Sequence, residues 1–134
     1  MNKLRVLIVD DSPVFLEAAR NFLADLPGVE CVECANSGPE ALGKAAEFFP
    51  DLVLMDISMP GMNGLETMDI LRNRLPAPRM YAVTLHDDAA YRAAALKNGA
   101  IDLIAKSNFA DVIPDLIERL AHSHHVTSKP ASRK

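Results

Sequence analysis

Short apolar runs alternate along the chain with longer segments in which apolar residues recur every three or four positions. The alternation occurs five times. A short, continuously apolar run is typical of a buried strand, and the longer period is typical of a helix with one face on the core. The pattern predicts strands at about Leu4–Val9, Val29–Ala35, Leu52–Met55, Arg79–Thr84 and Ile101–Ala105, each followed by a helix.

Strands that are apolar on both faces and separated by helices pair in parallel, with helices on both sides of the sheet. The sequence therefore predicts one α/β domain over residues 1–121, with an open five-stranded parallel sheet. Residues 122–134 lack apolar periodicity and are predicted to be a flexible tail or a truncated linker. A stand-alone protein and the N-terminal part of a longer regulator both remain open.

Two prolines bear on where helices begin. Ser12-Pro13 supplies an N-cap followed by proline at the first helical position. Pro114 would disrupt a helix that begins at Asn108, but it fits a first turn if Asp111 is the N-cap. We therefore expect the last helix to begin after Asp111.

Composition narrows the class of protein. The 134 residues carry a net charge of −4, whereas nucleic-acid binding needs a basic face. No apolar run approaches the ~20 residues that span a bilayer, and the N-terminus lacks a signal-peptide pattern. We expect a cytoplasmic domain with no membrane or direct nucleic-acid contact.

Cys31 and Cys34 form a Cys-x-x-Cys motif, which occurs in redox and zinc sites. Here the motif lies within a predicted strand, where positions i and i+3 point to opposite faces. A structural zinc site would also need two more ligands. We interpret both residues as ordinary strand cysteines.

Polar side chains stand where four of the predicted strands end. Ligands of open α/β sheets collect at this carboxyl edge. Carboxylates crowded there repel one another unless a cation offsets their charge, and hard oxygen ligands suit Mg²⁺. An aspartate can also act as a nucleophile toward phosphorus. The residues are Asp10 and Asp11 after the first strand, Asp56 after the third, Thr84 after the fourth and Lys106 after the fifth.

These residues lie in stretches that resemble the CheY-like receiver domain of bacterial response regulators. The stretches are Val9-Asp10-Asp11-Ser12, Leu52 to Gly64 with Asp56-Ile57-Ser58-Met59-Pro60-Gly61-Met62-Asn63-Gly64, then Val83-Thr84 and Lys106. The resemblance covers about Leu4 to Ala121 and implies a flavodoxin-like sheet with strand order 2-1-3-4-5. Thr84–Asp88 and Lys106-Ser107 are similar to receivers of LuxR/FixJ-type transcription regulators.

The resemblance also implies a role for each site residue. Asp56 would be the phosphoacceptor, and Thr84 and Lys106 would contact the phosphoryl oxygens. Asp10, Asp11, Asp56 and the backbone carbonyl of Ser58 would hold Mg²⁺. The partner would be a sensor histidine kinase or a histidine phosphotransfer protein, and phosphorylation would switch the surface of the domain, with a homodimer as one outcome. The domain would catalyse only its own phosphorylation and dephosphorylation.

The sequence departs from the family pattern at several positions. Ser107 replaces the usual proline after the lysine, and Leu103 replaces an aromatic residue that rotates inward on activation. Leu85 is bulkier than the usual residue after the threonine, which predicts narrower access to Asp56. Ser58 and His86 flank the approach of an attacking water, so we expect them to set the lifetime of the aspartyl phosphate.

Three other functions compete with this interpretation. A phosphatase of the haloacid-dehalogenase type would carry Asp-x-Asp after its first strand, whereas Asp10 and Asp11 are adjacent. A nucleotide-binding flavodoxin-like domain would need a glycine-rich phosphate loop there. An interaction module that is never phosphorylated stays compatible with Leu85 and Leu103.

Overall fold

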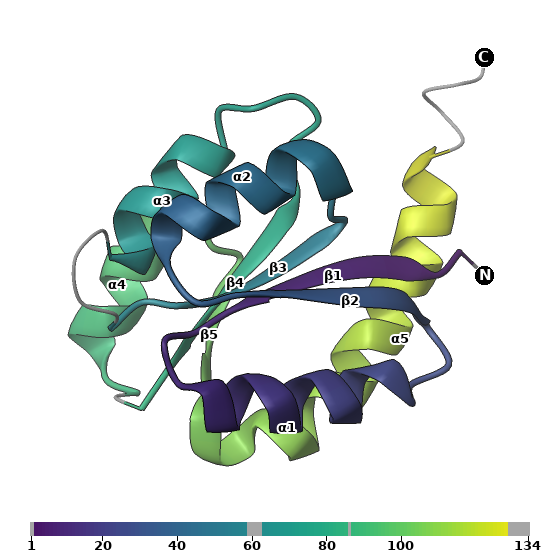
Figure 1. Cartoon of the computed structure of the whole chain (residues 1–134), viewed down its shortest axis with the longest axis horizontal. Helices are drawn as coiled ribbons and strands as arrows, with labels where there is room; N and C mark the ends of the chain where they lie inside the picture. The colour runs from purple at the N-terminus through teal and green to yellow at the C-terminus, as the bar shows by residue number, and fades with distance from the viewer. Residues whose placement is uncertain (1, 59–62, 86, 129–134) are drawn as a thin grey trace.

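The computed structural model describes residues 2–58, 63–85 and 87–128, with side chains described as far as His122. Five strands form a parallel sheet in the order β2-β1-β3-β4-β5 (Figure 1). They are β1 (Leu4–Val9), β2 (Val29–Ala35), β3 (Leu52–Asp56), β4 (Arg79–Thr84) and β5 (Asp102–Ala105). The predicted fold class and strand order are confirmed.

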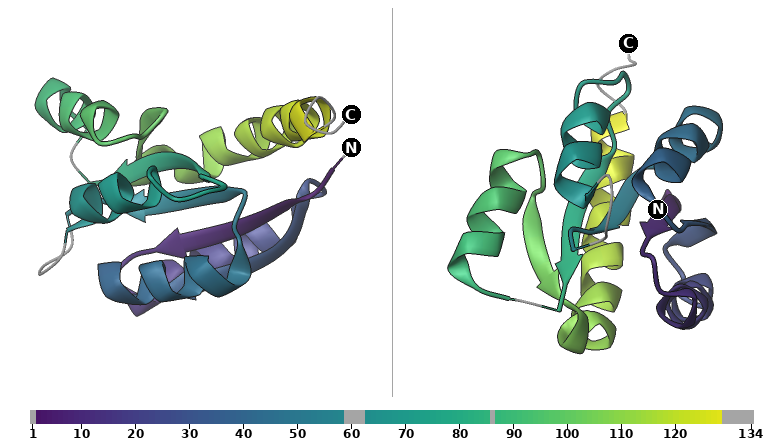
Figure 2. Two further views of the ribbon diagram at one scale, coloured as in Figure 1. Left: turned by 90° about the horizontal axis from the view of Figure 1, so that it is seen from above. Right: turned by 60° about the vertical axis from the view of Figure 1, so that its left-hand side comes forward.

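The helices lie on both faces of the sheet (Figures 1 and 2). α1 and α5 pack on one face through a core that includes Leu23 and Ile113. α2, α3 and α4 pack on the other through residues such as Ala41, Met68 and Ala95. The helices are α1 (Pro13–Ala24), α2 (Gly38–Phe48), α3 (Gly64–Leu71), α4 (Ala89–Lys97) and α5 (Phe109–Ser128), with a 3₁₀ turn η1 (Lys106–Asn108) before α5.

Local capping explains the start of α1. The Ser12 hydroxyl accepts a hydrogen bond from the backbone N–H of Phe15 at 3.2 Å, and Pro13 occupies the first turn. This cap satisfies one of the N–H groups that a helix start leaves unpaired. It also fixes the direction in which α1 leaves the carboxyl edge of the sheet.

The predicted start of the last helix is wrong. α5 begins at Phe109, directly after η1, so Pro114 lies inside the helix and Asp111 is in its first turn instead of capping it. Phe109 is buried and its ring packs 5.4 Å from that of Phe15. Burial of this aromatic side chain contributes more than the one hydrogen bond that Pro114 removes from the exposed Ala110 carbonyl.

The C-terminal segment also differs from expectation. The backbone of α5 is helical to Ser128, which the lack of apolar periodicity after residue 121 did not predict, and a flexible tail or truncated linker over residues 122–134 remains a prediction. Residues 122–128 have no apolar face in the sequence. A helix that has already formed can nevertheless continue through them, because each added residue gains one hydrogen bond without a new nucleation step. The placement of a domain boundary near residue 121 remains a prediction.

Both cysteines lie in β2, as predicted, and neither forms a disulfide. Burial raises the pKa of the Cys34 thiol, against the smaller opposing effects of Arg20 and Lys44. A reactive thiol needs the opposite shift. The interpretation of Cys34 as an ordinary strand residue therefore stands.

Candidate functional site

Three carboxylates meet where β1 and β3 end. Val9 and Met55 are partners in the parallel pairing of these strands, so Asp10 and Asp56, the next residues, lie side by side. Both are buried, at 0% and 2% exposure, whereas Asp11 is exposed. One carboxylate oxygen from each of the three lies within 4.8 Å of the others. The structure thus brings together the acidic residues that the sequence predicted to converge.

Asp56 is held by the residue two positions further along. The backbone N–H and the hydroxyl of Ser58 both donate to Oδ1 of Asp56, at 2.9 and 2.8 Å. These bonds leave Oδ2 facing the Lys106 ammonium at 3.6 Å. Ser58 therefore orients the aspartate that the sequence singles out as a nucleophile.

Asp10 contacts both the start of α1 and Lys106. Its Oδ1 accepts a hydrogen bond from the N–H of Ser12 at 2.9 Å, and its Oδ2 lies 2.6 Å from Nζ of Lys106. Burial raises the pKa of Asp10, and the charge of Asp56 adds to that shift, although Lys106 and Ser12 act in the opposite direction. The ionised form of Asp10 therefore lowers the stability of the folded state.

Lys106 extends from the end of β5 across the carboxyl edge to the carboxylates. Burial acts to lower its pKa, but the hydrogen bond to Asp10 and the charge of Asp56 outweigh burial, so the pKa is raised. The ammonium also lies 4.6 Å from the ring centroid of Phe15. Lys106 is therefore a fixed cation beside both buried carboxylates.

Thr84 is the last residue of β4 and is fully buried. It follows Val83, whose partner in the β3–β4 pairing is Asp56. The side chain is thus placed at the same edge as the carboxylates. Leu85 is 71% exposed, which does not support its predicted role in closing access to Asp56, while Leu103 is buried in the core.

The donor set fits a divalent cation. Oδ2 of Asp10 is buried and pairs with the Lys106 ammonium at 2.6 Å. One ammonium offsets only part of the charge of three crowded carboxylates, so the cluster remains costly unless a further cation binds. Three carboxylates, one of them exposed, could bind a hard ion that keeps several waters.

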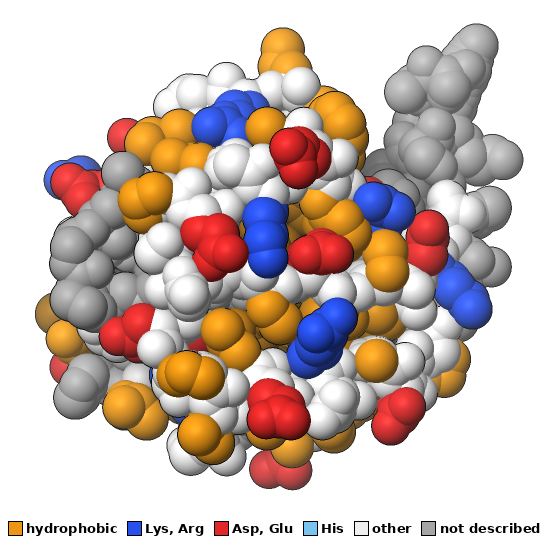
Figure 3. Space-filling model, viewed as in Figure 1, with side chains coloured by type: hydrophobic (Ala, Val, Ile, Leu, Met, Phe, Trp, Pro, Cys, Tyr) orange, Lys and Arg blue, Asp and Glu red, His pale blue; other side chains and the backbone are white. Residues whose placement is uncertain are grey.

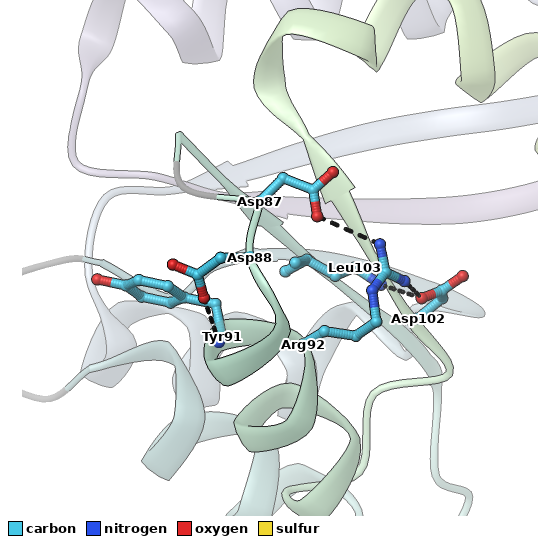
Figure 4. A network of polar contacts seen from close by, with 6 residues as sticks. All are labelled: Asp87, Asp88, Tyr91, Arg92, Asp102 and Leu103. Atoms are coloured by element: carbon cyan, nitrogen blue, oxygen red, sulfur yellow. Dashed lines mark hydrogen bonds and ion pairs between the residues drawn. The ribbon is translucent and has the colours of Figure 1, made fainter.

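The loop after β4 is tied to β5 by an arginine on α4 (Figure 4). The Arg92 guanidinium donates to Asp87 at 3.2 Å and also to Asp102. The Asp88 side chain caps α4 by accepting from the N–H of Tyr91 at 2.9 Å. The segment that follows Thr84 is thereby anchored to two elements.

Two further residues shape the site in addition to those with a role predicted from the sequence. A Cβ on Gly64 would lie 2.2 Å from the backbone oxygen of Asp56, so only glycine lets α3 begin this close to β3. Phe15, whose ring centroid lies 4.6 Å from the Lys106 ammonium, falls within the apolar face of its helix, so its spacing indicates only a core position. His86 and the segment 59–62 lie outside the described residues, so their predicted roles stay predictions.

Comparison with known proteins agrees with this geometry. Residues 6–118 match the family model of the response regulator receiver domain. The protein-glutamate methylesterase/protein-glutamine glutaminase of Thermotoga maritima is 34% identical over 130 residues, which cover 92% of this chain and 38% of that protein. The transcriptional regulatory protein DegU of Brevibacillus brevis is 33% identical over 120 residues, covering 90% of this chain and 51% of DegU.

Solved structures agree as well. A two-component response regulator of the LuxR family from Aurantimonas sp. SI85-9A1 superposes with a TM-score of 0.82 at 30% identity, over 91% of this chain and 87% of that chain. This chain spans a third to a half of the length of the curated relatives above. Among the described residues, no helix is long and apolar enough to cross a membrane. The chain belongs to the response regulator receiver domain family of two-component systems.

Proposed function

We propose that Asp56 accepts a phosphoryl group in a Mg²⁺-dependent reaction and that the added charge switches the surface of the domain. One observation carries the proposal. Asp56 is buried at the end of the central strand β3, with Lys106 and two further carboxylates beside it. A buried acidic cluster of this kind suits phosphoryl transfer, which depends on positioning and on charge neutralisation.

The reaction forms one bond and breaks another. Oδ2 of Asp56 attacks the phosphorus of a phosphohistidine, the P–N bond breaks, and the leaving imidazole takes up a proton from solvent. The two Ser58 hydrogen bonds to Oδ1 keep Oδ2 as the attacking atom. Hydrolysis later returns inorganic phosphate when water attacks phosphorus and the P–O bond to Asp56 breaks.

The remaining site residues supply charge and hydrogen bonds. Asp10, Asp11, Asp56 and the backbone carbonyl of Ser58 would hold Mg²⁺, which neutralises phosphoryl charge when bound. Lys106 places a second positive charge 3.6 Å from Asp56 and could reach a phosphoryl oxygen there. The Thr84 hydroxyl, at the end of the neighbouring strand, would donate to another oxygen.

Switching follows from the phosphoryl group, which places a charge of about −1.5 to −2 on three oxygens where Asp56 carried the single charge of a carboxylate. Drawing Thr84 and Lys106 toward the phosphoryl group pulls on the ends of β4 and β5. We propose that α4, β5 and the start of α5 form the surface that shifts. Both conformations pre-exist, and phosphorylation changes their populations.

The phosphodonor is a sensor histidine kinase or a histidine phosphotransfer protein. We propose no direct nucleic-acid contact by this domain, given its net charge of −4. Figure 3 shows acidic and basic side chains interspersed on one face, without a basic stripe. Control of transcription would pass through a separate effector, and phosphorylation-linked dimerisation and a cytoplasmic location are further parts of the proposal.

The test is intact mass after incubation with acetyl phosphate, with and without Mg²⁺. We expect a gain of about 80 Da, the mass of one phosphoryl group, in wild type with Mg²⁺. Asp56→Asn should show no gain, whereas Asp25→Asn, at the exposed C-cap of α1, should behave as wild type. No gain in wild type would overturn the proposal and favour an interaction module, and turnover of p-nitrophenyl phosphate would favour a phosphatase.

A further inference from the structure

Two carboxylates and one aromatic ring lie beside the Lys106 ammonium. Nζ lies 2.6 Å from Oδ2 of Asp10 and 3.6 Å from Oδ2 of Asp56. It also lies over the face of the Phe15 ring, 4.6 Å from the ring centroid. This distance is within the range in which a cation is attracted by the negative face of an aromatic ring.

The ring below the ammonium is itself held in place. The N–H of Phe15 donates to the N-cap Ser12, which fixes the backbone in the first turn of α1. The Phe15 ring packs against the Phe109 ring in a T-shaped arrangement, with 76° between the ring planes and centroids 5.4 Å apart. Phe109 is buried at the first turn of α5 and also packs against Phe22, at 6.3 Å. The ring under Lys106 is therefore part of an aromatic cluster that joins α1 to α5.

A fixed ring changes where a flexible lysine can rest. Lysine carries its charge on a four-carbon stem, and ordering that stem loses rotamer entropy. Two carboxylates attract the ammonium without fixing its position between them. The face of the Phe15 ring gives a further attractive surface, and the side chain of Lys106 is only 14% exposed, so water competes weakly with the ring for the ammonium.

We infer that Phe15 is a positioning residue for Lys106, whose ring keeps the ammonium within reach of Asp56. The inference rests on the proposed function, because it assigns the ring a part in phosphorylation of Asp56. Phe15 touches neither the phosphodonor nor the phosphoryl group in this scheme. It acts through Lys106 and should matter only while that lysine is present.

The first test measures the position of Lys106 without any phosphodonor. Protons above a ring face are shifted upfield, so the Lys106 ε-methylene resonances in NMR spectra of wild type should lie upfield of those of other lysines. Phe15→Leu should move them downfield, and Phe15→Tyr, which keeps the ring, should restore them. Unchanged resonances in a folded Phe15→Leu variant would overturn the inference.

The second test is the rate of phosphorylation by acetyl phosphate with saturating Mg²⁺. Phe15→Leu should lower the rate about two- to fivefold, the factor that a modest cation–π attraction represents, and Phe15→Tyr should stay near wild type. Phe22→Leu is the matched control, because Phe22 packs on Phe109 but is not under the ammonium. An equal loss of rate in Phe22→Leu would show that the effect is one of packing and would overturn the inference.

A double-mutant cycle separates positioning from structure. In a Lys106→Ala background, Phe15→Leu should change the phosphorylation rate no further, since the ring then has no cation to hold. A further loss in that background would overturn the inference and leave the proposed function intact. Failure of wild type to become phosphorylated at all would instead overturn the proposed function.

Discussion

Lys106 Nζ lies 2.6 Å from Oδ2 of Asp10, closer than it lies to Asp56. In the scheme proposed above, Mg²⁺ binds the carboxylate that this lysine already pairs with. Ion binding should therefore shift Lys106 away from Asp10. The same contact explains how a buried acidic cluster persists before the ion binds, since a nearby opposite charge partly offsets the repulsion between carboxylates.

Asp10→Asn should stabilise the protein when Mg²⁺ is absent. Burial and the charge of Asp56 raise the pKa of Asp10 above its ordinary value of 3.8, so its charged form costs folding stability. We expect the free energy of unfolding to rise by about 1 kcal/mol in EDTA at neutral pH. The gain should disappear below the ordinary Asp pKa and grow as the pH rises through the raised value, because only the ionised carboxyl carries the cost. Urea unfolding at several pH values measures this.

Mg²⁺ should make wild type more stable than Asp10→Asn, the reverse of their order in EDTA. A ligand that binds only the folded state stabilises it by about 2.7 kcal/mol at 100 times its dissociation constant. Wild type should gain this stability, and Asp10→Asn should gain much less, because it lacks one carboxylate of the cluster. An equal Mg²⁺-dependent rise in Tm for both proteins would exclude Asp10 as a ligand.

Gly64 and Gly43 provide a matched pair of glycine substitutions. A Cβ on Gly64 would approach the backbone of Asp56 and Ile57 to 2.2 and 2.9 Å, whereas a Cβ on Gly43 would meet nothing within 4 Å. We expect Gly64→Ala to lower the free energy of unfolding by about 1–3 kcal/mol through overpacking and to slow phosphorylation by displacing Asp56. Gly43→Ala, in an exposed part of α2, should raise the free energy of unfolding by about 0.5–1 kcal/mol. If Gly64→Ala is as stable as Gly43→Ala, the close approach of α3 to β3 at Gly64 is contradicted.

Ser58→Ala should lengthen the lifetime of the aspartyl phosphate. The Ser58 hydroxyl lies 2.8 Å from Oδ1 of Asp56, where it could also hold the attacking water. Removing it leaves the backbone N–H of residue 58 to hold Asp56 in place. We expect the loss of phosphate, followed by intact mass after removal of acetyl phosphate, to slow several-fold, as is usual when one positioned hydrogen bond is lost. A faster loss would mean that the hydroxyl shields the phosphate instead.

The sequence predicted the sheet well because its signals are local. Apolar runs placed β1 and β4 at their observed bounds, and β2 also lies where it was predicted although it carries two glutamates. The carboxyl-edge rule then brought Asp10, Asp56 and Lys106 together. The start of α5 was wrong because local rules for Pro114 were outweighed by burial of Phe109, a contact between distant segments. The ring of Phe15 under Lys106 joins positions 91 residues apart, so helix periodicity could identify Phe15 only as a core residue.

Arg92 should control the mobility of the loop after β4. Its guanidinium joins Asp87 in that loop to Asp102 in β5 (Figure 4). The pairs are partly exposed, so Arg92→Gln should lower the free energy of unfolding by less than about 1 kcal/mol. The rate of amide hydrogen exchange at Leu85 and Asp87 should nevertheless rise. Without the Arg92 ion pairs, local opening of the loop costs less free energy.

Arg20→Gln, an exposed arginine on α1, is the control and should leave exchange in the loop unchanged. An increase spread evenly over the sheet in Arg92→Gln would indicate general destabilisation and contradict a local anchor. An unchanged loop would show that the ion pairs contribute nothing to its order. An increase confined to the loop would place the segment after Thr84 at the low-stability end of the fold, where a phosphorylation switch needs its moving part to be.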